Sequence, residues 1–291
     1  MNTAMTLSAE VEAIKAQRIS KSKKREALFK LGLTAADVQY VLRDENQPTN
    51  IRGSFTFGVE IECGVNRYNL AEPARRNGMA YEYQHYNHTD RHDIFKFVHD
   101  GSLTVENSIE CVSPVLKGRD GKAALKAAVK TLNEAGARVN SSCGLHVHIG
   151  AANLTPMQYC NVFVNYAYLE SVIDSFMARS RRDSRWCRSI KPRLVELEAA
   201  QTHREIAMAM SYDRYFKVNS QSYDRHKTIE FRVHQGTTNY EKIDAWVAFC
   251  GKLVLWSKKH RLTSEVQSID EIPFLTAKEK SFFKRRAEQL A

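Results

Sequence analysis

Long apolar runs, close pairs of cysteines and repeated segments are all lacking in this sequence of 291 residues. No apolar stretch approaches the roughly 18 residues that a membrane-spanning helix needs, and the first residues lack the apolar core of a signal peptide. The six cysteines lie far apart without a Cys-x-x-Cys motif, and a chain of this length can bury a core without disulfides. We therefore expect a cytoplasmic protein with reduced thiols and no membrane contact.

An excess of acidic residues is also lacking. Lys and Arg number 43 against 33 Asp and Glu, which gives a formal net charge of +10, and hydrophobic residues make up 43% of the chain. These values are typical of a globular protein with one large domain, or one domain and a small appendage. The charge leaves nucleic acid, nucleotide phosphates and acidic substrates open as partners.

The charge is distributed unevenly along the chain. Residues 53–178 contain 11 basic and 13 acidic side chains, whereas residues 179–232 contain 13 basic and 7 acidic ones. A protein that coats nucleic acid more often spreads its positive charge along a face or concentrates it in a tail. The observed pattern instead suits a site in which carboxylates hold a metal and arginines hold anions.

The N-terminal residues are predicted to form short helices. Ser8 and Thr34 are suitable N-caps for a first and a third helix, and Gly32 would end a second helix that runs from about Lys23 to Leu31. This segment resembles a fragment of a helix-turn-helix. Because a stand-alone DNA reader usually has a fuller three-helix core, we favour a helical lead-in to the main domain.

The polar residues 44–53, with one proline and one glycine, are predicted to be a linker. The predicted organisation is therefore an N-terminal helical segment, residues 1–50, and a main domain, residues 51–291. The main domain starts with apolar and polar residues in strict alternation, which predicts a strand. Further strands are predicted at 94–100, 108–114, 144–150, 215–222 and 228–234.

Helices are predicted between these strands at 119–135, 155–178 and 240–259, each with an apolar stripe at helical spacing. Thr155 and Pro156 suit the N-cap and first position of the second of these helices. Strands and helices do not alternate one for one. We therefore predict an α+β fold, with a curved antiparallel β-sheet and helices packed on one side, rather than a doubly wound parallel sheet.

Three predicted strands have polar residues two positions apart, which places each pair on one face of the sheet. The pairs are Glu60 with Glu62, His146 with His148, and Glu230 with Arg232. Taken singly, they could be a solvated sheet face, two hydrogen-bonded histidines and a salt bridge.

Taken together, and with Glu110 on a fourth and mostly apolar strand, the pairs indicate a metal site. Carboxylate oxygens with an imidazole suit Mg²⁺ or Mn²⁺ better than structural zinc, which favours thiolates. We interpret the neighbouring Cys63, Cys111 and Cys143 as small buried residues, with zinc ligation as the alternative.

The segment 179–193, which we call the arginine run, contains six arginines and one lysine against one aspartate. Its simplest interpretation is a solvated basic loop or helix end. The functional alternative is a clamp for nucleotide phosphates or for an acidic substrate, and contact with a nucleic acid backbone is a further alternative. The arginines that we expect to bind phosphate are Arg181, Arg182 and Arg185.

The strings GVEIE, HDGSL followed by IECVSP, CGLHVHIG and TIEFRVHQGT together resemble the putative amidoligase family. This family is related to glutamine synthetase and glutamate–cysteine ligase, which are carboxylate–amine ligases. The resemblance extends over about residues 54–260. Glutamine synthetase has a Glu-x-Glu strand, a Gly-Met-His-x-His strand and a Glu-x-Arg strand in the same order, so the resemblance implies a glutamine synthetase-like catalytic domain.

The resemblance also implies roles for particular residues. His148 matches a position near the nucleotide phosphates, and Arg232 matches one that contacts the transferred phosphoryl group. Arg214 and Asn219 match positions where substrate or nucleotide contacts occur. The implied catalytic residues are Arg232, Glu62 and Glu230. The implied metal ligands are Glu60, Glu62, Glu110, His146 and Glu230.

The function implied is ligation of a carboxylate to an amine or ammonia with ATP and Mg²⁺ or Mn²⁺. The acid could be an amino acid, a peptide or a cell-wall fragment, and the family context includes phage. Two alternatives remain: a metal-dependent hydrolase or nuclease with the same carboxylates and histidines, and a nucleic-acid-binding protein that uses the N-terminal helices and the arginine run.

Overall fold

The computed structural model describes residues 10, 13–14, 17, 21–32, 55–84 and 93–291 of the chain. The chain divides into two compact units, Met1–Asn50 and Ile51–Ala291. In the first unit, helix α2 (Lys21–Lys30) covers most of the predicted second helix, and Gly32 adopts the left-handed conformation, with φ +81°, that suits a helix end. Most of the predicted first helix, the helix after Thr34 and the linker 44–53 lie outside the described residues.

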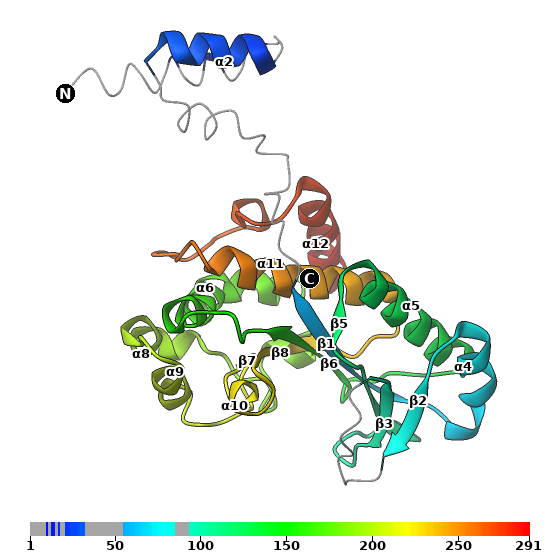
Figure 1. Cartoon of the computed structure of the whole chain (residues 1–291). Coiled ribbons are helices and arrows are strands. Elements are labelled where there is room, and N and C mark those ends of the chain that lie inside the picture. The colour runs from blue at the N-terminus through cyan, green and yellow to red at the C-terminus, as the bar shows by residue number, and fades with distance from the viewer. Residues whose placement is uncertain (1–9, 11–12, 15–16, 18–20, 33–54, 85–92) are drawn as a thin grey trace. The chain divides into compact units, whose positions relative to one another are not determined.

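An open sheet with the strand order β2-β3-β4-β1-β6-β8-β7, with β5 paired to β1, forms the centre of the second unit (Figure 1). Its pairs are antiparallel except for β2 with β3, which is parallel. The predicted antiparallel sheet is therefore confirmed, with one parallel edge pair added. The strands are β1 (Thr56–Gly64), β2 (Tyr81–Gln84), β3 (Phe95–His99), β4 (Ser108–Val112), β5 (Leu116–Lys117), β6 (Gly144–Gly150), β7 (Val218–Asn219) and β8 (Thr228–Gln235).

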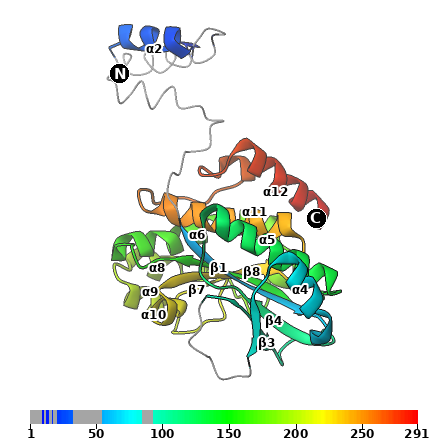
Figure 2. The same cartoon turned by 45° about the vertical axis from the view of Figure 1, so that its right-hand side comes forward.

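Three long helices, α5 (Gly118–Glu134), α6 (Pro156–Ser175) and α11 (Tyr240–Ser257), cover one face of the sheet (Figures 1 and 2). All three are predicted from their apolar stripes. Thr155 caps α6 with a full capping box, and Pro156 is its first residue. The remaining helices are α4 (Ala71–Asn77), α7 (Arg179–Arg182), α8 (Leu194–Ala199), α9 (His203–Ala209), α10 (Ser222–His226) and α12 (Ala277–Leu290), with short 3₁₀ turns η1 (Arg67–Asn69), η2 (Lys191–Arg193) and η3 (Ile269–Glu271).

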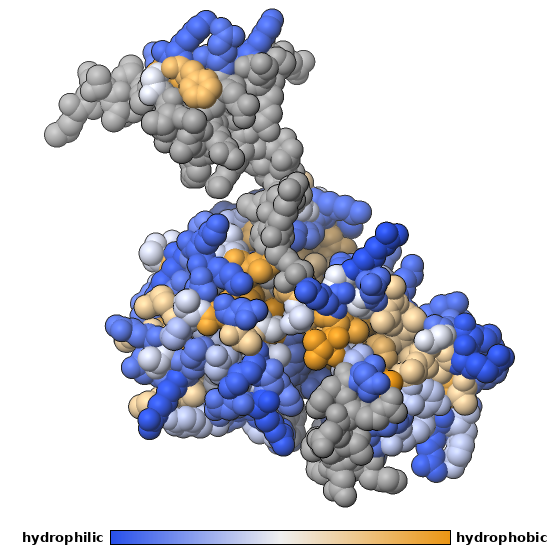
Figure 3. Space-filling model, in the orientation of Figure 1, coloured by the Kyte–Doolittle hydropathy of each residue, from blue (hydrophilic) through white to orange (hydrophobic). Residues whose placement is uncertain are grey.

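The core lies between the sheet and this helical layer, where Val59, Ile61 and Val147 are fully buried with Trp246 of α11. The face of this unit seen in Figure 3 is largely hydrophilic, with smaller apolar areas between the polar residues. All six cysteines are free and buried, as expected for Cys63, Cys111 and Cys143. None of the described helices combines the length and the apolar character needed to cross a bilayer.

The register of the sheet gathers polar residues on the face opposite the core. Glu60 pairs with His146, and Glu62 pairs with Glu110. His148 pairs with Glu230 on the other side of β6. Because these partners are directly opposite one another on neighbouring strands, their side chains emerge side by side.

A β-bulge interrupts the pairing of β6 with β8. Leu145 pairs with His234 and Val147 pairs with Phe231, so two residues of β8 lie opposite His146 alone. Strict alternation would place His234 on the same face as Glu230. The bulge instead places it on the core face, 5.8 Å from the ring of Trp246, where burial lowers its pKa to about 3 and keeps it neutral.

The prediction of a strand over 215–222 is corrected by the structure to the two residues of β7. The chain before β7 bonds to a different partner, because the backbone N–H of Lys217 donates to Arg188 O and that of Arg188 donates to Tyr215 O. After β7 the chain turns directly into α10. The arginine run and the residues before β7 are thereby joined at the edge of the sheet.

Candidate functional site

A cavity of about 1100 Å³ opens over the polar face of the sheet. Its lining comes from strands β1, β4, β6 and β8, from the loops around residues 100 and 142, and from segments around residues 181–186, 214–219 and 221–226. The predicted site residues that line it are Glu60, Glu62, Glu110, His146, His148, Arg181, Arg185, Arg214, Asn219, Glu230 and Arg232.

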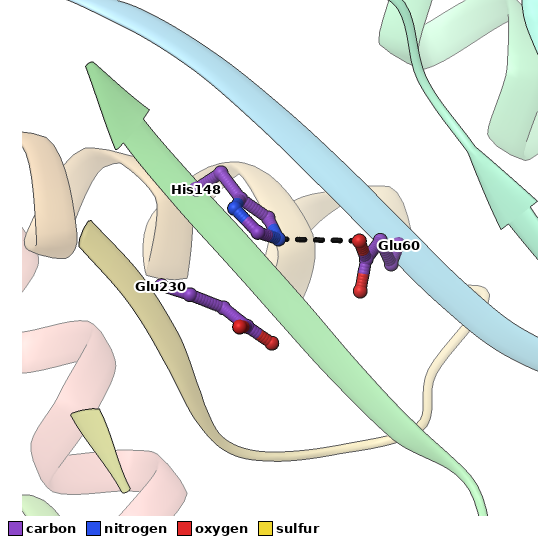
Figure 4. A group of neighbouring side chains, drawn as sticks. All are labelled: Glu60, His148 and Glu230. Atoms are coloured by element: carbon purple, nitrogen blue, oxygen red, sulfur yellow. Dashed lines mark ion pairs between the residues drawn. The ribbon is translucent and has the colours of Figure 1, made fainter. Parts of the chain in front are cut away.

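At the bottom of the cavity the carboxylates and imidazoles are in direct contact. Glu60 lies between the two histidines, with Oε2 3.0 Å from His146 Nδ1 and Oε1 3.2 Å from His148 Nε2. His146 Nε2 lies 3.4 Å from Glu62 Oε1, and its Nδ1 lies 3.6 Å from Glu230 Oε1. Figure 4 shows Glu60, His148 and Glu230 pointing toward one another from separate strands.

These residues, with Glu110 and Asp100, form three groups, and within each group the ligand atoms lie within 4.8 Å of one another. This spacing lets the atoms of each group reach one ion. The donors are carboxylate oxygens and imidazole nitrogens without thiolates, a set that suits Mg²⁺ or Mn²⁺, so the residues fit the predicted metal. The groups are Glu60 with His148 and Glu230, Glu60 with Glu110 and His146, and Glu62 with Asp100 and Glu110.

The charges of this cluster are strongly coupled. Burial alone would raise the pKa of Glu60, but the attraction of His148 and hydrogen bonds from both histidines hold it well below its usual value. Glu110 has no such compensation. Burial, together with the negative charges of Glu60 and Glu62, raises its pKa well above the usual range. A divalent cation beside Glu110 would remove this penalty.

The histidine and arginine next to the carboxylates are cationic at neutral pH. Burial lowers the pKa of His148, but the attraction of Glu60 outweighs it and raises that pKa to about 9. The pKa of Arg232 is raised because its attraction to Glu230 outweighs burial, and the two side chains form an ion pair of 2.5 Å. Asn219 Nδ2 donates to the other oxygen of Glu230, so both partners fix this carboxylate.

Arg181 extends the positive charge across the cavity. It is only 4% exposed, and its Nη2 donates to the backbone oxygen of Arg232 at 2.6 Å. Within the part of the chain that the structure describes, neither Arg181 Nε nor Arg232 Nε has a hydrogen-bond partner. Buried guanidinium donors without partners are suited to receive an anion.

Two aromatic residues accompany Arg185 and Arg214: Tyr215, which follows Arg214 in the motif DRYFKVN, and Trp186, for which the sequence gives no signal. Trp186, 39% exposed, lies edge-on to Tyr215 with ring centroids 5.2 Å apart. The guanidinium of Arg185 lies over Trp186 and that of Arg214 over Tyr215. We call Arg181, Arg185, Arg214 and Arg232 the arginine wall.

Asp100 joins one of the three groups that could hold a metal, whereas its Asp-Gly sequence by itself indicates a turn. It does turn the loop, because its Oδ1 accepts a hydrogen bond from the backbone N–H of Ser102. Arg225 and His226 of α10 also line the cavity. No motif marks these two residues, because a single turn of helix before β8 gives no periodic signal.

Arg182, a predicted phosphate ligand, does not line the cavity. Its guanidinium donates to the backbone oxygens of Met177, Ser175 and Leu290. These bonds connect the first residues of the arginine run to the C-terminal end of α6 and to α12. The Nε and Nη2 of Arg182 are therefore occupied by backbone oxygens of residues that do not line the cavity.

The backbone of Gly144 fixes the position of the Glu62 carboxylate. The N–H of Gly144 donates to Glu62 Oε2. A Cβ at this position would lie 3.0 Å from His146 Nε2, 3.1 Å from Arg181 Nη2 and 3.3 Å from Glu62 Oε2. The glycine therefore leaves room for three functional side chains to converge.

Carboxylates on β1 and β4 thus face arginines on β8 and the segments beside it. A family model described as putative amidoligase enzyme matches residues 54–254, which is more than two thirds of the chain and includes every residue of the cavity named above. No curated protein matches the chain.

Proposed function

The chain belongs to the putative amidoligase enzyme family, and from this premise we propose that it is an ATP- and Mg²⁺-dependent carboxylate–amine ligase. The observation that carries the proposal is the division of one cavity into a carboxylate–histidine cluster and an arginine wall. A family member with this charge arrangement has what phosphoryl transfer needs, namely charge neutralisation and positioning. We further propose that the catalytic unit has the glutamine synthetase-like fold.

The metal ligands in this proposal are the five predicted ones, with Asp100 added. Divalent ions held by these residues would supply charge neutralisation for the phosphates. At least two ions would account for three donor groups spread over neighbouring strands. The full set is Glu60, Glu62, Asp100, Glu110, His146 and Glu230.

The arginine wall, with His148 and Asn219, would bind the triphosphate and the acid. Arg232 contacts the proposed metal ligands, which we call the metal cluster, through its pair with Glu230, so we assign it to the phosphoryl group in transfer. Arg181 supports the same group from the next segment, through its bond to Arg232 O. Guanidinium groups suit this task because they grip phosphate or carboxylate through two donors at once.

The proposed reaction has two steps. A carboxylate oxygen of the acid attacks the γ-phosphorus of ATP, the bond to the ADP oxygen breaks, and an acyl phosphate forms. The amine then attacks the acyl carbon, phosphate leaves with the C–O bond electrons, and the amine loses a proton. The products are an amide or isopeptide bond, ADP and phosphate. The acid would be an amino acid, a peptide or a cell-wall fragment, and the amine an amino group or ammonia.

The test is a metabolite screen for ATP consumption that requires both an acid and an amine. Glu60→Gln keeps the shape of the side chain and removes its charge, and we expect it to reduce turnover by at least about a hundredfold, because metal stabilisation of phosphoryl transfer contributes several kcal/mol. The matched control is Glu72→Gln, because the side chain of Glu72 is exposed on helix α4. Undiminished turnover in Glu60→Gln would refute the metal assignment.

The rival metal-dependent hydrolase or nuclease uses the same carboxylates but needs no ATP. Calorimetry with ATP in the presence and absence of Mg²⁺ separates the two. We expect binding that requires Mg²⁺ and weakens in Arg232→Lys, because lysine cannot reproduce the two-donor contact. Cleavage of an ester, peptide or nucleic acid without nucleotide would instead support the rival.

A further inference from the structure

Behind the arginine wall lies a buried ion cluster of Lys217, Glu170 and Asp174, which we call the Lys217 cluster. Lys217 is 1% exposed. Its Nζ lies 3.1 Å from Glu170 Oε1 and 2.6 Å from Asp174 Oδ2. Both carboxylates come from the C-terminal half of α6, in the helical layer. None of the three residues lines the cavity.

Such a cluster is not explained by stability alone. Removing charges from water costs free energy that their mutual attraction often only balances, and apolar residues of the same size would stabilise the fold as well or better. Buried ionic groups can instead specify one arrangement of the elements they join. The question is therefore which elements the Lys217 cluster joins.

The main chain of Lys217 connects two parts of the site. Its N–H donates to Arg188 O at 2.9 Å, within the arginine run, and its carbonyl oxygen accepts from the N–H of Arg232 at 2.8 Å. Two residues further on, Asn219 donates to Glu230. The lysine thus lies between the run and the Glu-x-Arg strand.

Glu170 makes a second connection to the run. While one of its oxygens pairs with Lys217, the other accepts from the backbone N–H groups of Ile190 and Lys191, at 2.9 and 3.2 Å. Asp174 lies close to the end of α6, shortly before the run begins at Arg179. The far end of the segment that carries Arg181 and Arg185 is therefore bonded to the cluster, and its near end follows α6, the helix that carries both carboxylates.

We infer that the Lys217 cluster is a positioning device that sets the arginine wall against the metal cluster. Its residues act through the backbone of the run and of β8, and they touch neither metal ligands on β1 and β4 nor the cavity. The inference rests on the proposed function only in assigning phosphate to the arginine wall. It predicts that Lys217, Glu170 and Asp174 affect anion affinity through the arginines that they position, and leave metal affinity unchanged.

The test measures the affinity for a metal ion and the affinity for an anion separately. The triple variant Lys217→Met, Glu170→Gln and Asp174→Asn removes all three charges without leaving one unpaired. Binding of Mn²⁺ is measured alone, and binding of inorganic pyrophosphate is measured in EDTA, both by calorimetry. We expect pyrophosphate affinity to fall by about tenfold or more, since the loss of one charge-assisted hydrogen bond has this size, with Mn²⁺ affinity unchanged.

Two further variants complete the design. Glu170→Gln alone keeps an oxygen acceptor for the run and is the milder change if the triple variant does not fold, with an intermediate loss expected. Lys252→Met, which breaks the Lys252–Glu279 pair between α11 and α12, is the matched control. It should change neither affinity. Faster backbone hydrogen exchange over 179–193 in the cluster variants, but not in the control, is also expected.

Each outcome is decisive for the inference. Unchanged pyrophosphate affinity in a folded cluster variant, or an equal loss of Mn²⁺ and pyrophosphate affinity, overturns it. A wild-type chain that binds Mn²⁺ but no pyrophosphate overturns both the inference and the phosphate role of the wall. If the expected split is found but no acid and amine support ATP turnover, the ligase proposal fails and the positioning role stands.

Discussion

At the scale of single residues, the site shows how charge compensation selects the state of each carboxylate. Glu60 has two imidazoles within 3.2 Å and Glu230 has an arginine and an amide, so both stay ionised in a buried place. The charges that shift the pKa of Glu110 are all negative, and with burial they raise it. The Glu-x-Glu and His-x-His spacings predict which residues share a face, but they do not predict which carboxylate is left without a cationic partner.

The pKa of Glu110 makes metal binding dependent on pH. Because this pKa is raised well above its usual value, the carboxyl group takes up its proton at a higher pH than a free glutamate does. The metal needs the ionised form, so Mn²⁺ affinity should fall as the pH is lowered through the raised pKa, with protons released on binding. Calorimetry in buffers of different ionisation enthalpy measures both effects.

The control for this prediction is Glu110→Gln, which cannot ionise. Its Mn²⁺ affinity should be lower than that of the wild type at neutral pH and should vary less as the pH falls. An affinity that is equally steep in pH in both proteins would show that another group takes up the proton.

Gly144→Ala should impair the site although alanine adds one methyl group. The new Cβ would lie within 3.4 Å of atoms of His146, Arg181 and Glu62, so these side chains must move apart. We expect weaker Mn²⁺ and weaker pyrophosphate binding together, in contrast to the Lys217 cluster variants. Gly58→Ala is the control, because Gly58 does not line the cavity and a Cβ there would make only ordinary contacts, at 3.7 Å from Ser113 Oγ and 3.8 Å from His148 Cβ. Equal affinities in the two variants would contradict the prediction.

At the scale of elements, the sequence predicts the long periodic segments and misses the places where partners decide the structure. Strands β1, β6 and β8 and helices α5, α6 and α11 follow from alternation and apolar stripes, because burial on one face imposes those periods. The parallel edge strand β2 has only four residues. The shortening of β7 depends on backbone bonds to Arg188, which no local pattern contains.

The bulge in β8 is the clearest limit of sequence reasoning at this scale. The string TIEFRVHQ alternates throughout, so His234 and Arg232 are indistinguishable in pattern. Only the pairing with β6 separates them, by leaving two residues of β8 opposite His146. The consequence is chemical, because His234 becomes a neutral core residue while Arg232 stays in the cavity.

Helix α6 tests whether the stability of an element can be separated from the site it supports. Thr155 caps its N-terminus by accepting from the backbone N–H of Gln158, at the opposite end of the helix from Asp174. Thr155→Ala should lower the free energy of unfolding by about 1 kcal/mol, measured in urea, without changing Mn²⁺ or pyrophosphate affinity. Thr155→Ser keeps the hydroxyl and should restore stability, and a loss of affinity in the alanine variant alone would show that the cap and the cluster are coupled.

At the scale of the whole molecule, the uneven charge of the sequence becomes a spatial arrangement. The near-neutral residues 53–178 supply most of the metal cluster, and the strongly basic residues 179–232 supply the arginine wall. Sequence order predicts this separation of charge, but not that both parts line one cavity. That outcome depends on the central pairing of β1, β6 and β8, which brings segments far apart in the chain together.

The last prediction concerns residues 1–50 and what they contribute to the net charge of +10 and to binding. Residues 1–50 contain eight basic and six acidic side chains, so their removal leaves +8, and every residue assigned to the cavity lies in Ile51–Ala291. A chain of residues 51–291 should therefore bind Mn²⁺ and ATP as the full chain does, because neither the metal cluster nor the arginine wall loses a residue.

Affinity for double-stranded DNA, measured over a range of salt concentrations, should be weak in both chains and fall steeply with salt, as for binding to phosphates alone. Loss of ATP binding in the shorter chain would show that the N-terminal unit completes the site, and loss of a tight DNA affinity on deletion would favour the nucleic-acid-binding alternative instead.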